Sequence, residues 1–551
     1  MDSPSLSEVY RSTSHTLFGE DARPLLDKAL SLLDDGARDG ARTLIFLEAP
    51  TGYGKSTLSL AIYVAIKKGR LDLGQRIIHV LPMRSIGTHM HGRMQKYIQK
   101  LKEAGFPVME SEVGLQQMSS PGSPMLCKKF VITTLDTFVS SLYKIPPVEL
   151  KKLLTKGYAH YEVPRGCIYS ATVVFDEFHL FISSDSIVNG KSKMLTSALA
   201  GIIGLLEIGV PIIISTATLP KLIKEKIKEE VETAFEEDLY VSEITPSQSD
   251  LEFRKRKIKV ESIGEEDRVG KIVEAAEERR RVLVMANTVK NAVEIYYSLR
   301  KKGIKSVVIH AKMIEAEKRR RLSYVEQSPC VVVSTQIFEA GVDMSFDTLV
   351  TEAAPPDSLI QRSGRVARYG GCGEVFVYPL SEGGKSIYAE ELVEKTIKKL
   401  SEVGELSQRL LEIYDEYVGT QLIERNLFNQ LRLIDVYPSF SADVAKRVWE
   451  AYCGFVREGE MIPVVPRAHV KNFIKEPRER RNLIFTIGDD EFRRLLKSGL
   501  IKELITESNK TILCEEIREL AKMNCLSREF VVNDVVAVIV EGYDEEVGLA
   551  N

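Results

Sequence analysis

The sequence predicts an α/β protein made of two parallel-sheet lobes in tandem, followed by a mainly helical accessory domain. Short runs rich in β-branched residues alternate with longer amphipathic stretches from about residue 41 to residue 240. A second series of the same kind follows and reaches residue 378. Strands that alternate with helices in this way form parallel sheets with helices packed on their faces. Two such series therefore predict two lobes.

Each lobe has five candidate strands. Those of the first lobe are 43–48, 77–81, 130–133, 172–176 and 212–216, and those of the second are 282–286, 306–310, 331–335, 348–351 and 374–378. The polar stretch SEITPSQSDLEFRKRK lacks apolar periodicity and separates the two series. A chain of 551 residues is also too long for a single core and predicts roughly three domains. We expect domains at 1–245, 246–385 and 386–551, the last with no motif that assigns it a role.

The composition indicates a protein without a global electrostatic preference for nucleic acid. Charged residues make up 28% of the chain, but the formal net charge is only -3. Binding to a polyanion would therefore depend on a local basic groove. The seven cysteines are scattered and form no C-x-x-C pair, which argues against a zinc ribbon and a disulfide framework.

The sequence predicts neither secretion nor contact with a membrane. The first residues, MDSPSLSEVY, contain no basic and apolar leader pattern. The most apolar span, IIGLLEIGVPIIIST, is interrupted by Glu207 and Pro211 and is too short to cross a bilayer. We therefore expect a cytoplasmic protein.

A phosphate-binding loop is predicted between the first strand and the helix that follows it. The strand TLIFLE leads into APTGYGKS and then into TLSLAIYVAIKK. Backbone N–H groups of such a loop surround phosphate oxygens, while Lys55 would reach the β- and γ-phosphates of ATP and Ser56 would bind Mg²⁺. The first position is Ala49 in place of glycine, and the alternative is a glycine turn with a solvated lysine. The other candidate nucleotide-binding residues of this loop are Thr51, Gly52, Gly54 and Thr57.

Two further motifs follow strands of the first lobe. ATVVF leads into DEFH, which places Asp176 and Glu177 at the carboxyl end of a buried strand, where open α/β sheets bind ligands. Asp176 is suited to hold magnesium through water, and Glu177 to activate the attacking water. The alternative is a pair of helix-capping acids. The strand GVPIII ends in STATLP, whose hydroxyl residues are expected to hydrogen-bond to the carboxylate motif.

The second lobe offers two motifs rich in polar residues. VVVST is followed by QIFEAGVD, in which Gly341 and Asp343 are candidate nucleotide-binding residues. PPDSLI leads into QRSGRVAR, in which Arg365 and Arg368 lie three residues apart. On a helix these two arginines would share a face and could both reach a phosphate. The alternative is a solvated basic helix face.

Taken in order, APTGYGKS, LPMRSI, VITTLDTF, DEFH, STATLP, VMANTVKNA, STQIFEAGVD and QRSGRVAR resemble the motif set of superfamily-two helicases of the DExH kind. The resemblance covers roughly residues 41 to 380 and implies two RecA-like lobes that hydrolyse ATP with Mg²⁺ between them. It implies that His179 pairs with Gln361 and that Arg365 and Arg368 act as arginine fingers, a role it does not give to Arg362. It also places Thr216 and Thr218 in the coupling motif and Pro82, Arg84, Thr134 and Asp136 in the motifs that contact the nucleic acid strand.

Within that superfamily, EAPTGYGKS, DEFH and STATLP most resemble the helicase of type I CRISPR interference complexes. Many members of that family carry a nuclease with a histidine-aspartate metal site, but none of the eight histidines here is followed by aspartate. The resemblance therefore implies the stand-alone helicase half, with a separate nuclease subunit and a CRISPR RNA-guided surveillance complex as partners. It also implies movement on single-stranded DNA in the three-prime to five-prime direction.

Two other functions remain open at the level of the sequence. A DExH RNA helicase would share every nucleotide-site motif, because the chemistry of ATP hydrolysis does not reveal whether the protein moves along DNA or RNA. A non-hydrolysing nucleic-acid-binding scaffold would keep the fold without the activity. The resemblance also implies an adenine-recognising glutamine upstream of the phosphate-binding loop, but FGEDARPLLDKAL in that position contains no glutamine, so adenine recognition is unassigned.

Overall fold

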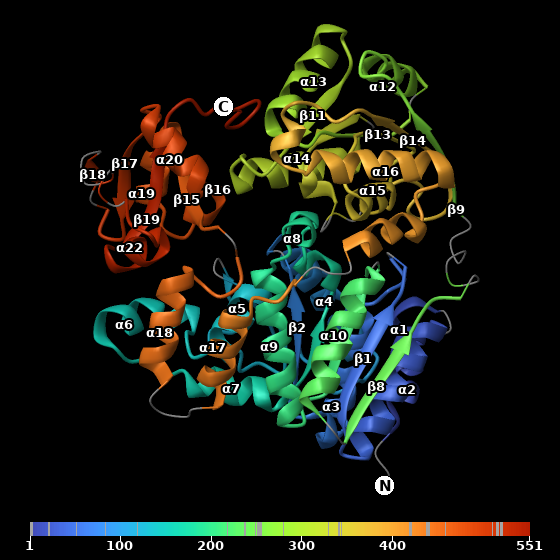
Figure 1. Cartoon of the computed structure of the whole chain (residues 1–551), viewed down its shortest axis with the longest axis vertical. Helices are drawn as coiled ribbons and strands as arrows, with labels where there is room; N and C mark the ends of the chain where they lie inside the picture. The colour runs from blue at the N-terminus through green and yellow to red at the C-terminus, as the bar shows by residue number, and fades with distance from the viewer. Residues whose placement is uncertain are drawn as a thin grey trace. The chain divides into compact units, whose positions relative to one another are not determined.

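The computed structural model divides into two compact units, which are described separately (Figure 1). Unit 1 comprises Met1–Phe253 and Tyr414–Arg457, and unit 2 comprises Arg254–Ile413 and Glu458–Asn551. The structure describes residues 4–550 apart from 20–21, 51, 83, 118–119, 218, 236–237, 248–249, 251–255, 279, 329, 340–341, 343, 418–420, 437–440, 458, 510, 514–516, 518 and 520–521.

Unit 1 is built on an eight-stranded sheet in the order β4-β3-β5-β2-β6-β7-β1-β8. All neighbouring strands are parallel except β3 and β4, so the carboxyl ends of the five central strands meet at one edge. The strands are β1 (Arg42–Glu48), β2 (Arg76–Leu81), β3 (Val113–Gln117), β4 (Ser120–Pro121), β5 (Phe130–Thr134), β6 (Ala171–Phe175), β7 (Ile212–Thr216) and β8 (Leu239–Ile244).

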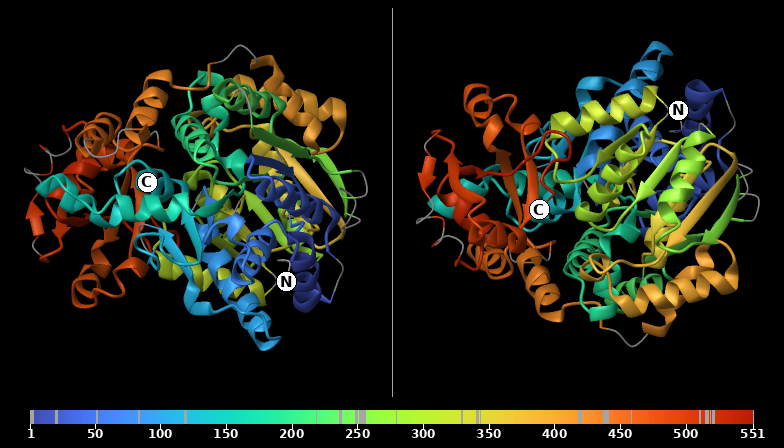
Figure 2. Two further views of the ribbon diagram at one scale, coloured as in Figure 1. Left: turned by 90° about the horizontal axis from the view of Figure 1, so that it is seen from below. Right: turned by 90° about the horizontal axis from the view of Figure 1, so that it is seen from above.

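Helices cover both faces of this sheet. The amino-terminal helices, drawn in blue in Figures 1 and 2, gather in one apolar cluster against β1 and β2. The helices of unit 1 are α1 (Leu6–Phe18), α2 (Pro24–Arg38), α3 (Thr57–Lys67), α4 (Arg84–Glu103), α5 (Leu135–Leu142), α6 (Leu150–Lys156), α7 (Glu162–Tyr169), α8 (Ser184–Asn189), α9 (Lys193–Glu207), α10 (Lys221–Ala234), α17 (Arg425–Val436) and α18 (Ser441–Tyr452). The α1 helix begins at a capping box, in which Ser5 accepts from the Glu8 N–H and Glu8 accepts from the Ser5 N–H.

Unit 2 contains a six-stranded parallel sheet in the order β11-β12-β10-β13-β14-β9. Its strands are β9 (Arg256–Ser262), β10 (Val282–Met285), β11 (Ser306–Ile309), β12 (Val331–Ser334), β13 (Thr348–Glu352) and β14 (Gly371–Tyr378). Its helices are α12 (Arg268–Glu277), α13 (Val289–Lys301), α14 (Glu315–Gln327), α15 (Pro356–Ser363) and α16 (Glu390–Val403). The prediction of two parallel-sheet α/β lobes is therefore confirmed.

A second sheet of unit 2 lies in the carboxy-terminal region, where the sequence pattern indicated mainly helices. Its five strands are ordered β16-β15-β19-β17-β18, and β15 and β19 form its only parallel pair among the described residues. The strands are β15 (Met461–Pro466), β16 (Phe485–Gly488), β17 (Ile501–Thr506), β18 (Thr511–Leu513) and β19 (Val535–Val540), with helices α19 (Val470–Lys475), α20 (Asp489–Lys497) and α22 (Leu526–Val532).

The region from residue 386 onward is shared between the two units. Helix α17 packs on α9 of unit 1 (Figure 1). Gly204 of α9 leaves room there for the side chains of Arg432 and Asp435. Asp435 accepts hydrogen bonds from Arg165 at 3.0 Å and from Tyr169 at 2.7 Å. Buried side chains, and not chain order, thus attach this helical segment to the first lobe.

The sequence pattern did not predict four strands of the two lobes, β3, β4, β8 and β9, and all but β3 lie at sheet edges. Within the described part of the chain, β8 pairs with β1 alone and β9 with β14 alone. The β9 sequence RKIKVES is largely exposed, and charged residues on an edge strand prevent edge-to-edge association. Because such strands have one paired side and few buried residues, they lack the apolar run by which central strands are identified.

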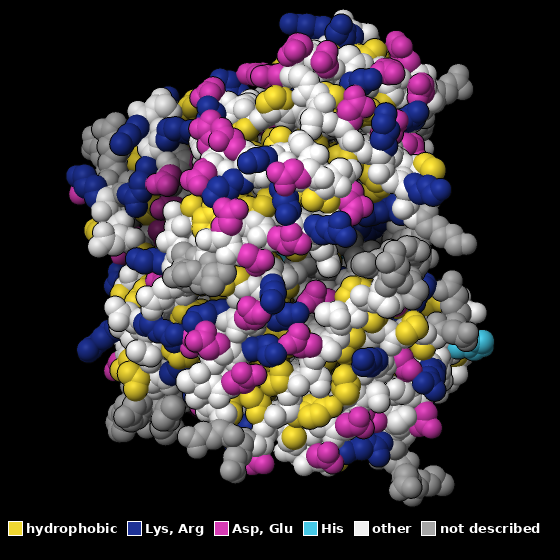
Figure 3. All heavy atoms as spheres, turned by 45° about the vertical axis from the view of Figure 1, so that its right-hand side comes forward, with side chains coloured by type: hydrophobic (Ala, Val, Ile, Leu, Met, Phe, Trp, Pro, Cys, Tyr) yellow, Lys and Arg dark blue, Asp and Glu magenta, His cyan; other side chains and the backbone are white. Residues whose placement is uncertain are grey.

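Two surface properties concern binding. On the face shown in Figure 3, acidic and basic side chains are interspersed, in keeping with the near-zero net charge. Among the described residues, no helix has the length and apolar character needed to cross a bilayer.

Candidate nucleotide site

The phosphate-binding loop lies between β1 and α3, as the sequence predicts. Gly52 and Gly54 have φ angles of 79° and 94°, a left-handed region that favours glycine. Lys55 is 6% exposed, and its Nζ donates to the Ala49 carbonyl at 3.2 Å. The loop thus holds an almost buried lysine at the start of a helix. The Ser56 hydroxyl beside it accepts a hydrogen bond from Arg93 of α4 at 2.7 Å.

The carboxylate motif follows β6, which lies between β2 and β7. The strand ends at Phe175, one residue earlier than predicted, and Asp176 is the first residue beyond it. The Asp176 Oδ1 accepts from the Ser215 hydroxyl at 2.9 Å and from the Glu177 N–H at 3.0 Å. Burial acts to raise the pKa of Asp176, but the neighbouring His79, the charge of Lys55 and the Ser215 hydroxyl hold it well below its ordinary value. Asp176 is therefore an ionised, oriented carboxylate.

Glu177 points its carboxylate toward the phosphate-binding loop. Its backbone has a φ of 51°, an unfavourable region for a non-glycine residue that is often found at functional sites. The Oε1 lies 3.9 Å from the Lys55 Nζ, and the Oε2 lies 3.7 Å from the His179 Nδ1. Opposite charges at the first of these distances attract without forming a direct hydrogen bond.

The end of β7 lies next to both the phosphate-binding loop and the carboxylate motif. This is because β7 lies between β1, which precedes the loop, and β6, which precedes the motif. Ser215 bonds to Asp176, and the Thr216 hydroxyl lies 2.9 Å from the His179 Nδ1. The predicted hydrogen bonds between the hydroxyl motif and the carboxylate motif are confirmed.

The residues expected to contact a nucleic acid strand lie along the same edge of the sheet. Pro82 follows β2, and Thr134 ends β5 with its hydroxyl donating to Thr137 at 3.2 Å. Asp136 is the second residue of α5 and accepts a hydrogen bond from the Arg457 Nε at 2.9 Å. Arg84 is the first residue of α4, and its side chain is outside the described part of the structure. The pairing of Asp136 with Arg457 had no signal in the sequence, since more than 300 residues separate the two.

The prediction that Arg365 and Arg368 share a helix face is wrong. α15 ends at Ser363, and both arginines follow its Gly364 C-cap. The Arg365 guanidinium turns into lobe two and donates to the carbonyls of Phe338, Glu339 and Val342 at 2.5 to 2.7 Å. The helix stops because Val366 pairs with Phe346 in a β-bridge and Ala367 adopts a φ of 47°.

Gln361 and Arg362 occupy the last turns of α15. The Gln361 Oε1 is buried and has no hydrogen-bond partner among the described residues. Arg362 is fully buried and donates to Glu339 at 2.8 Å, and its other bonds reach Thr351, the Glu352 carbonyl and Asn287 at 2.9 to 3.0 Å. Arg362 is thus the centre of a buried polar network that the motif pattern did not reveal.

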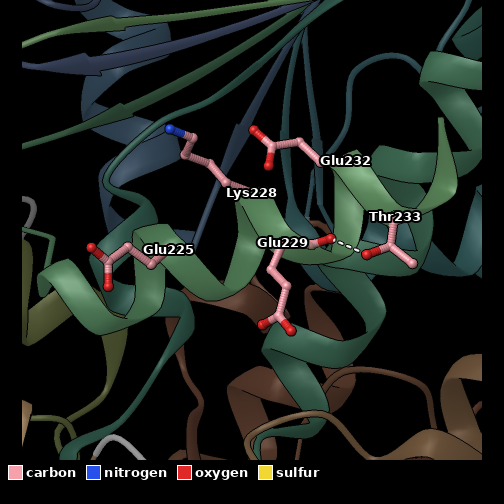
Figure 4. Close-up of a pocket in the computed structure, with 5 residues that line it drawn as sticks. All are labelled: Glu225, Lys228, Glu229, Glu232 and Thr233. Carbon is pink, nitrogen blue, oxygen red and sulfur yellow. Dashed lines mark hydrogen bonds between the residues drawn. The ribbon is translucent and has the colours of Figure 1, made fainter. Parts of the chain in front are cut away.

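Four candidate residues lie outside the described part of the structure. They are Thr51, Thr218, Gly341 and Asp343. A hollow on the surface of α10, drawn in Figure 4, is lined by Glu225, Lys228, Glu229, Glu232 and Thr233. These residues all come from one helix and include none of the motif residues, so the hollow is separate from the nucleotide site.

The order of motifs, the two parallel-sheet lobes and the buried lysine beside two acids resemble those of helicases of the DEAD/DEAH-box class. A family model described as DEAD/DEAH box helicase matches residues 37–225. A second model, described as the C-terminal part of CRISPR-associated nuclease/helicase Cas3, matches residues 278–371. The resemblance to superfamily-two helicases, and among them to the CRISPR-associated helicase family, is confirmed.

Individual relatives agree with these matches. The CRISPR-associated helicase Cas3 of Thermoproteus tenax is 28% identical over 404 residues, which cover 70% of this chain and 66% of the relative. Matches to two further Cas3 relatives span 46% and 49% of their lengths. The T. fusca Cas3-AMPPNP structure has a TM-score of 0.63 at 14% identity and covers 98% of this chain and 70% of that one. A chain in the structure of a CRISPR RNA-guided surveillance complex, pre-nicking, has a TM-score of 0.56 at 15% identity over 92% of this chain and 66% of that one.

Proposed function

We propose that this chain is an ATP-dependent translocase and helicase that moves along single-stranded DNA in CRISPR interference. The observation that carries the proposal is the meeting of Lys55, Asp176 and Glu177 at one edge of the first-lobe sheet. A buried cation, an ionised acid and a second acid within a few ångströms are the groups that phosphoryl transfer to water requires.

The residues present fit ATP and Mg²⁺. Ser56 and Asp176 offer oxygen ligands, which magnesium prefers, and Lys55 offers a positive charge for the β- and γ-phosphates. Magnesium would neutralise charge on the phosphates during transfer. Because the Ser56 hydroxyl accepts a hydrogen bond from Arg93 in this structure, Arg93 would release it or turn to a phosphate when nucleotide binds.

Glu177 is suited to act as the general base on the attacking water. Its carboxylate is part-exposed and lies on the Lys55 side of the motif, where the terminal phosphate would be. His179 is held by Thr216 at the end of β7. Through this contact between His179 and Thr216, binding or loss of the terminal phosphate can shift the end of β7.

The second lobe would supply the remaining charges. We propose that Arg365 and Arg368 stabilise the transferred phosphate when the lobes close, and that Gln361 pairs with His179. The buried Gln361 Oε1 without a partner among the described residues supports the second role, because a buried acceptor is costly until a donor reaches it. Arg365 would have to leave the carbonyls of Phe338, Glu339 and Val342 before it acts, so its role depends on a rearrangement of these contacts.

The proposed track is single-stranded DNA, contacted by Pro82, Arg84, Thr134 and Asp136. A carboxylate cannot bind a phosphate directly, so Asp136 would contact the strand through a base, a sugar or its partner Arg457. The similarity to Cas3 helicases favours DNA over RNA. A DExH RNA helicase remains the alternative, because the nucleotide residues would be the same.

We further propose a CRISPR RNA-guided surveillance complex as the recruiting partner and the cytoplasm as the location. One structural neighbour is a chain of a CRISPR RNA-guided surveillance complex, pre-nicking, which supports this partner. A nuclease provided outside these 551 residues would cut the DNA, since no histidine in the sequence is followed by aspartate.

The deciding experiment is ATPase activity measured by phosphate release, titrated with single-stranded DNA, duplex DNA and RNA at matched salt. We expect stimulation by single-stranded DNA and near-complete loss of turnover in Lys55→Ala. Equal or greater stimulation by RNA would favour the RNA helicase. Absence of turnover with every nucleic acid would favour a non-hydrolysing scaffold, and normal turnover in Lys55→Ala would refute the assignment of the phosphate-binding loop.

A further inference from the structure

A buried histidine lies between the carboxylate motif and α3, the phosphate-binding helix, which follows the phosphate-binding loop and has Ser56 as its N-cap. His79 is the fourth residue of β2, its side chain has no solvent exposure, and its neighbours in the strand are Ile78 and Val80. Its Nδ1 lies 2.7 Å from the Ser59 hydroxyl of α3, and its Nε2 lies 3.3 Å from the Asp176 Oδ2. The ring therefore contacts a polar group on each side.

These contacts define the tautomer that the site favours. Asp176 Oδ2 is an acceptor, so a proton on the His79 Nε2 would point toward it, and the Ser59 O–H could then donate to Nδ1. The Nε2 contact is long and poorly aligned, and this atom makes no regular hydrogen bond among the described residues. A buried donor in this position is costly unless a nearby acceptor satisfies it, and Asp176 is the acceptor that faces it.

The two oxygens of Asp176 have different surroundings. Oδ1 is held by Ser215 and by the N–H of Glu177. Oδ2 faces His79. The carboxylate plane is thus defined from the Oδ1 side by β7 and from the Oδ2 side by β2, and loss of the imidazole would free it to rotate about its Cβ–Cγ bond.

Ser59 ties the same ring to the phosphate-binding helix. It lies on α3, three residues after Ser56, and it is buried. Hence one imidazole joins the helix that carries Ser56 to the strand end that carries Asp176. These are the two side chains proposed to hold magnesium, and their separation sets whether both can reach the ion.

We propose that His79 is a positioning residue that orients Asp176 toward magnesium and fixes its distance from the phosphate-binding helix. This inference rests on the proposed ATPase function. Groups that hydrogen-bond to metal ligands without touching the metal set the ligand orientation, and their loss typically costs 10- to 100-fold in metal affinity or activity.

The test is a Mg²⁺ titration of the full chain at fixed ATP, together with a binding measurement. In His79→Leu we expect the half-saturating Mg²⁺ concentration for turnover to rise about tenfold or more. We also expect Mg²⁺ to lose most of its ability to tighten binding of a fluorescent, non-hydrolysable ATP analogue, while affinity for the Mg²⁺-free analogue stays within a fewfold. His79→Gln should recover part of the effect, because its amide N–H can reach Oδ2 while its oxygen cannot replace both contacts.

Two controls separate positioning from packing. Ile78→Ala removes buried volume from the next residue of β2, so it should lower stability without moving the Mg²⁺ dependence. Ser59→Ala should shift the Mg²⁺ dependence in the same direction as His79→Leu but by less. If His79→Leu does not fold, His79→Gln and Ser59→Ala carry the test.

The result that would overturn the inference is a parental Mg²⁺ dependence in all the folded His79 and Ser59 variants, with stability alone reduced. Failure of the proposed function gives a different pattern. In that case Lys55→Ala would keep its turnover, or the parent would show none, whereas failure of the His79 inference alone leaves a Lys55-dependent ATPase with unshifted Mg²⁺ dependence.

Discussion

Arg362→Ala is expected to lower the stability of the second lobe by more than a substitution at an exposed residue would. The parent side chain has no solvent exposure, pairs with Glu339 and bonds to Asn287 and Thr351. Its removal leaves Glu339 buried without its counter-charge. Breaking a buried ion pair by removing one partner typically costs about 3–5 kcal/mol. In a domain of 150–250 residues, 1 kcal/mol shifts Tm by about 2–4 °C, so the transition of unit 2 should fall by roughly 6–20 °C.

The pH dependence of this loss has a definite sign. Burial raises the pKa of the Glu339 carboxyl, and the Arg362 guanidinium opposes that rise. Without Arg362, the folded-state pKa of Glu339 lies still further above its unfolded value, which is near 4.3. Its protonated form then favours folding below the unfolded pKa, and this contribution is lost as the pH rises through the folded-state pKa. The destabilisation should therefore be largest at neutral and alkaline pH and shrink on acidification.

The assay is thermal or urea unfolding at several pH values, followed by a probe in unit 2. The matched control is the double variant Arg362→Met with Glu339→Leu. It removes both charges, so it should recover much of the stability, since replacing a whole buried pair with apolar residues is often neutral. A Tm change in Arg362→Ala below about 2 °C at neutral pH would refute the account of Arg362 as a buried structural centre.

Three further outcomes are expected. Glu177→Gln should bind ATP normally yet fail to release phosphate, because the amide cannot accept a proton; weakened nucleotide binding with intact turnover would contradict the role of Glu177. Arg365→Ala should lose on the order of a thousandfold in nucleic-acid-stimulated turnover with far smaller change in ATP affinity, and stimulated turnover within a fewfold of the parent would rule out a finger role. Gly204→Val should destabilise unit 1 by about 1–3 kcal/mol, because a side chain there collides with Asp435, whereas Gly166→Ala meets no neighbouring atom and serves as the control in urea unfolding.

The nucleotide site could be predicted from the sequence because of how parallel sheets are built. The phosphate-binding loop, DEFH and STATLP each follow a buried apolar run that reads as a central strand. The carboxyl ends of parallel strands lie at one edge, so residues placed there by pattern alone come together in space. Asp176 and Ser215 are 39 residues apart in sequence and 2.9 Å apart in the structure, as the order of motifs indicated.

Contacts between residues that are far apart in the sequence could not be predicted in this way. The motif QRSGRVAR reads as a helix carrying arginines on one face, but the chain leaves the helix at Gly364 and turns Arg365 onto three carbonyls. Helical spacing in a sequence carries no information about where a helix is stopped by pairing with a distant residue. The β-bridge between Val366 and Phe346 is such a pairing.

The two α/β lobes and the positions of the candidate nucleotide-binding motifs could be predicted from the sequence, because apolar periodicity and strand-end residues are local properties. Three other features depend on tertiary packing: His79 lies between Ser59 and Asp176, Arg362 is buried, and 414–457 packs with the first lobe. Each of these depends on which side chains meet across long stretches of chain. A single histidine in an apolar strand looks the same in sequence whether it faces a hydrophobic core or a carboxylate, and the packing of β2 against β6 and α3 makes the difference.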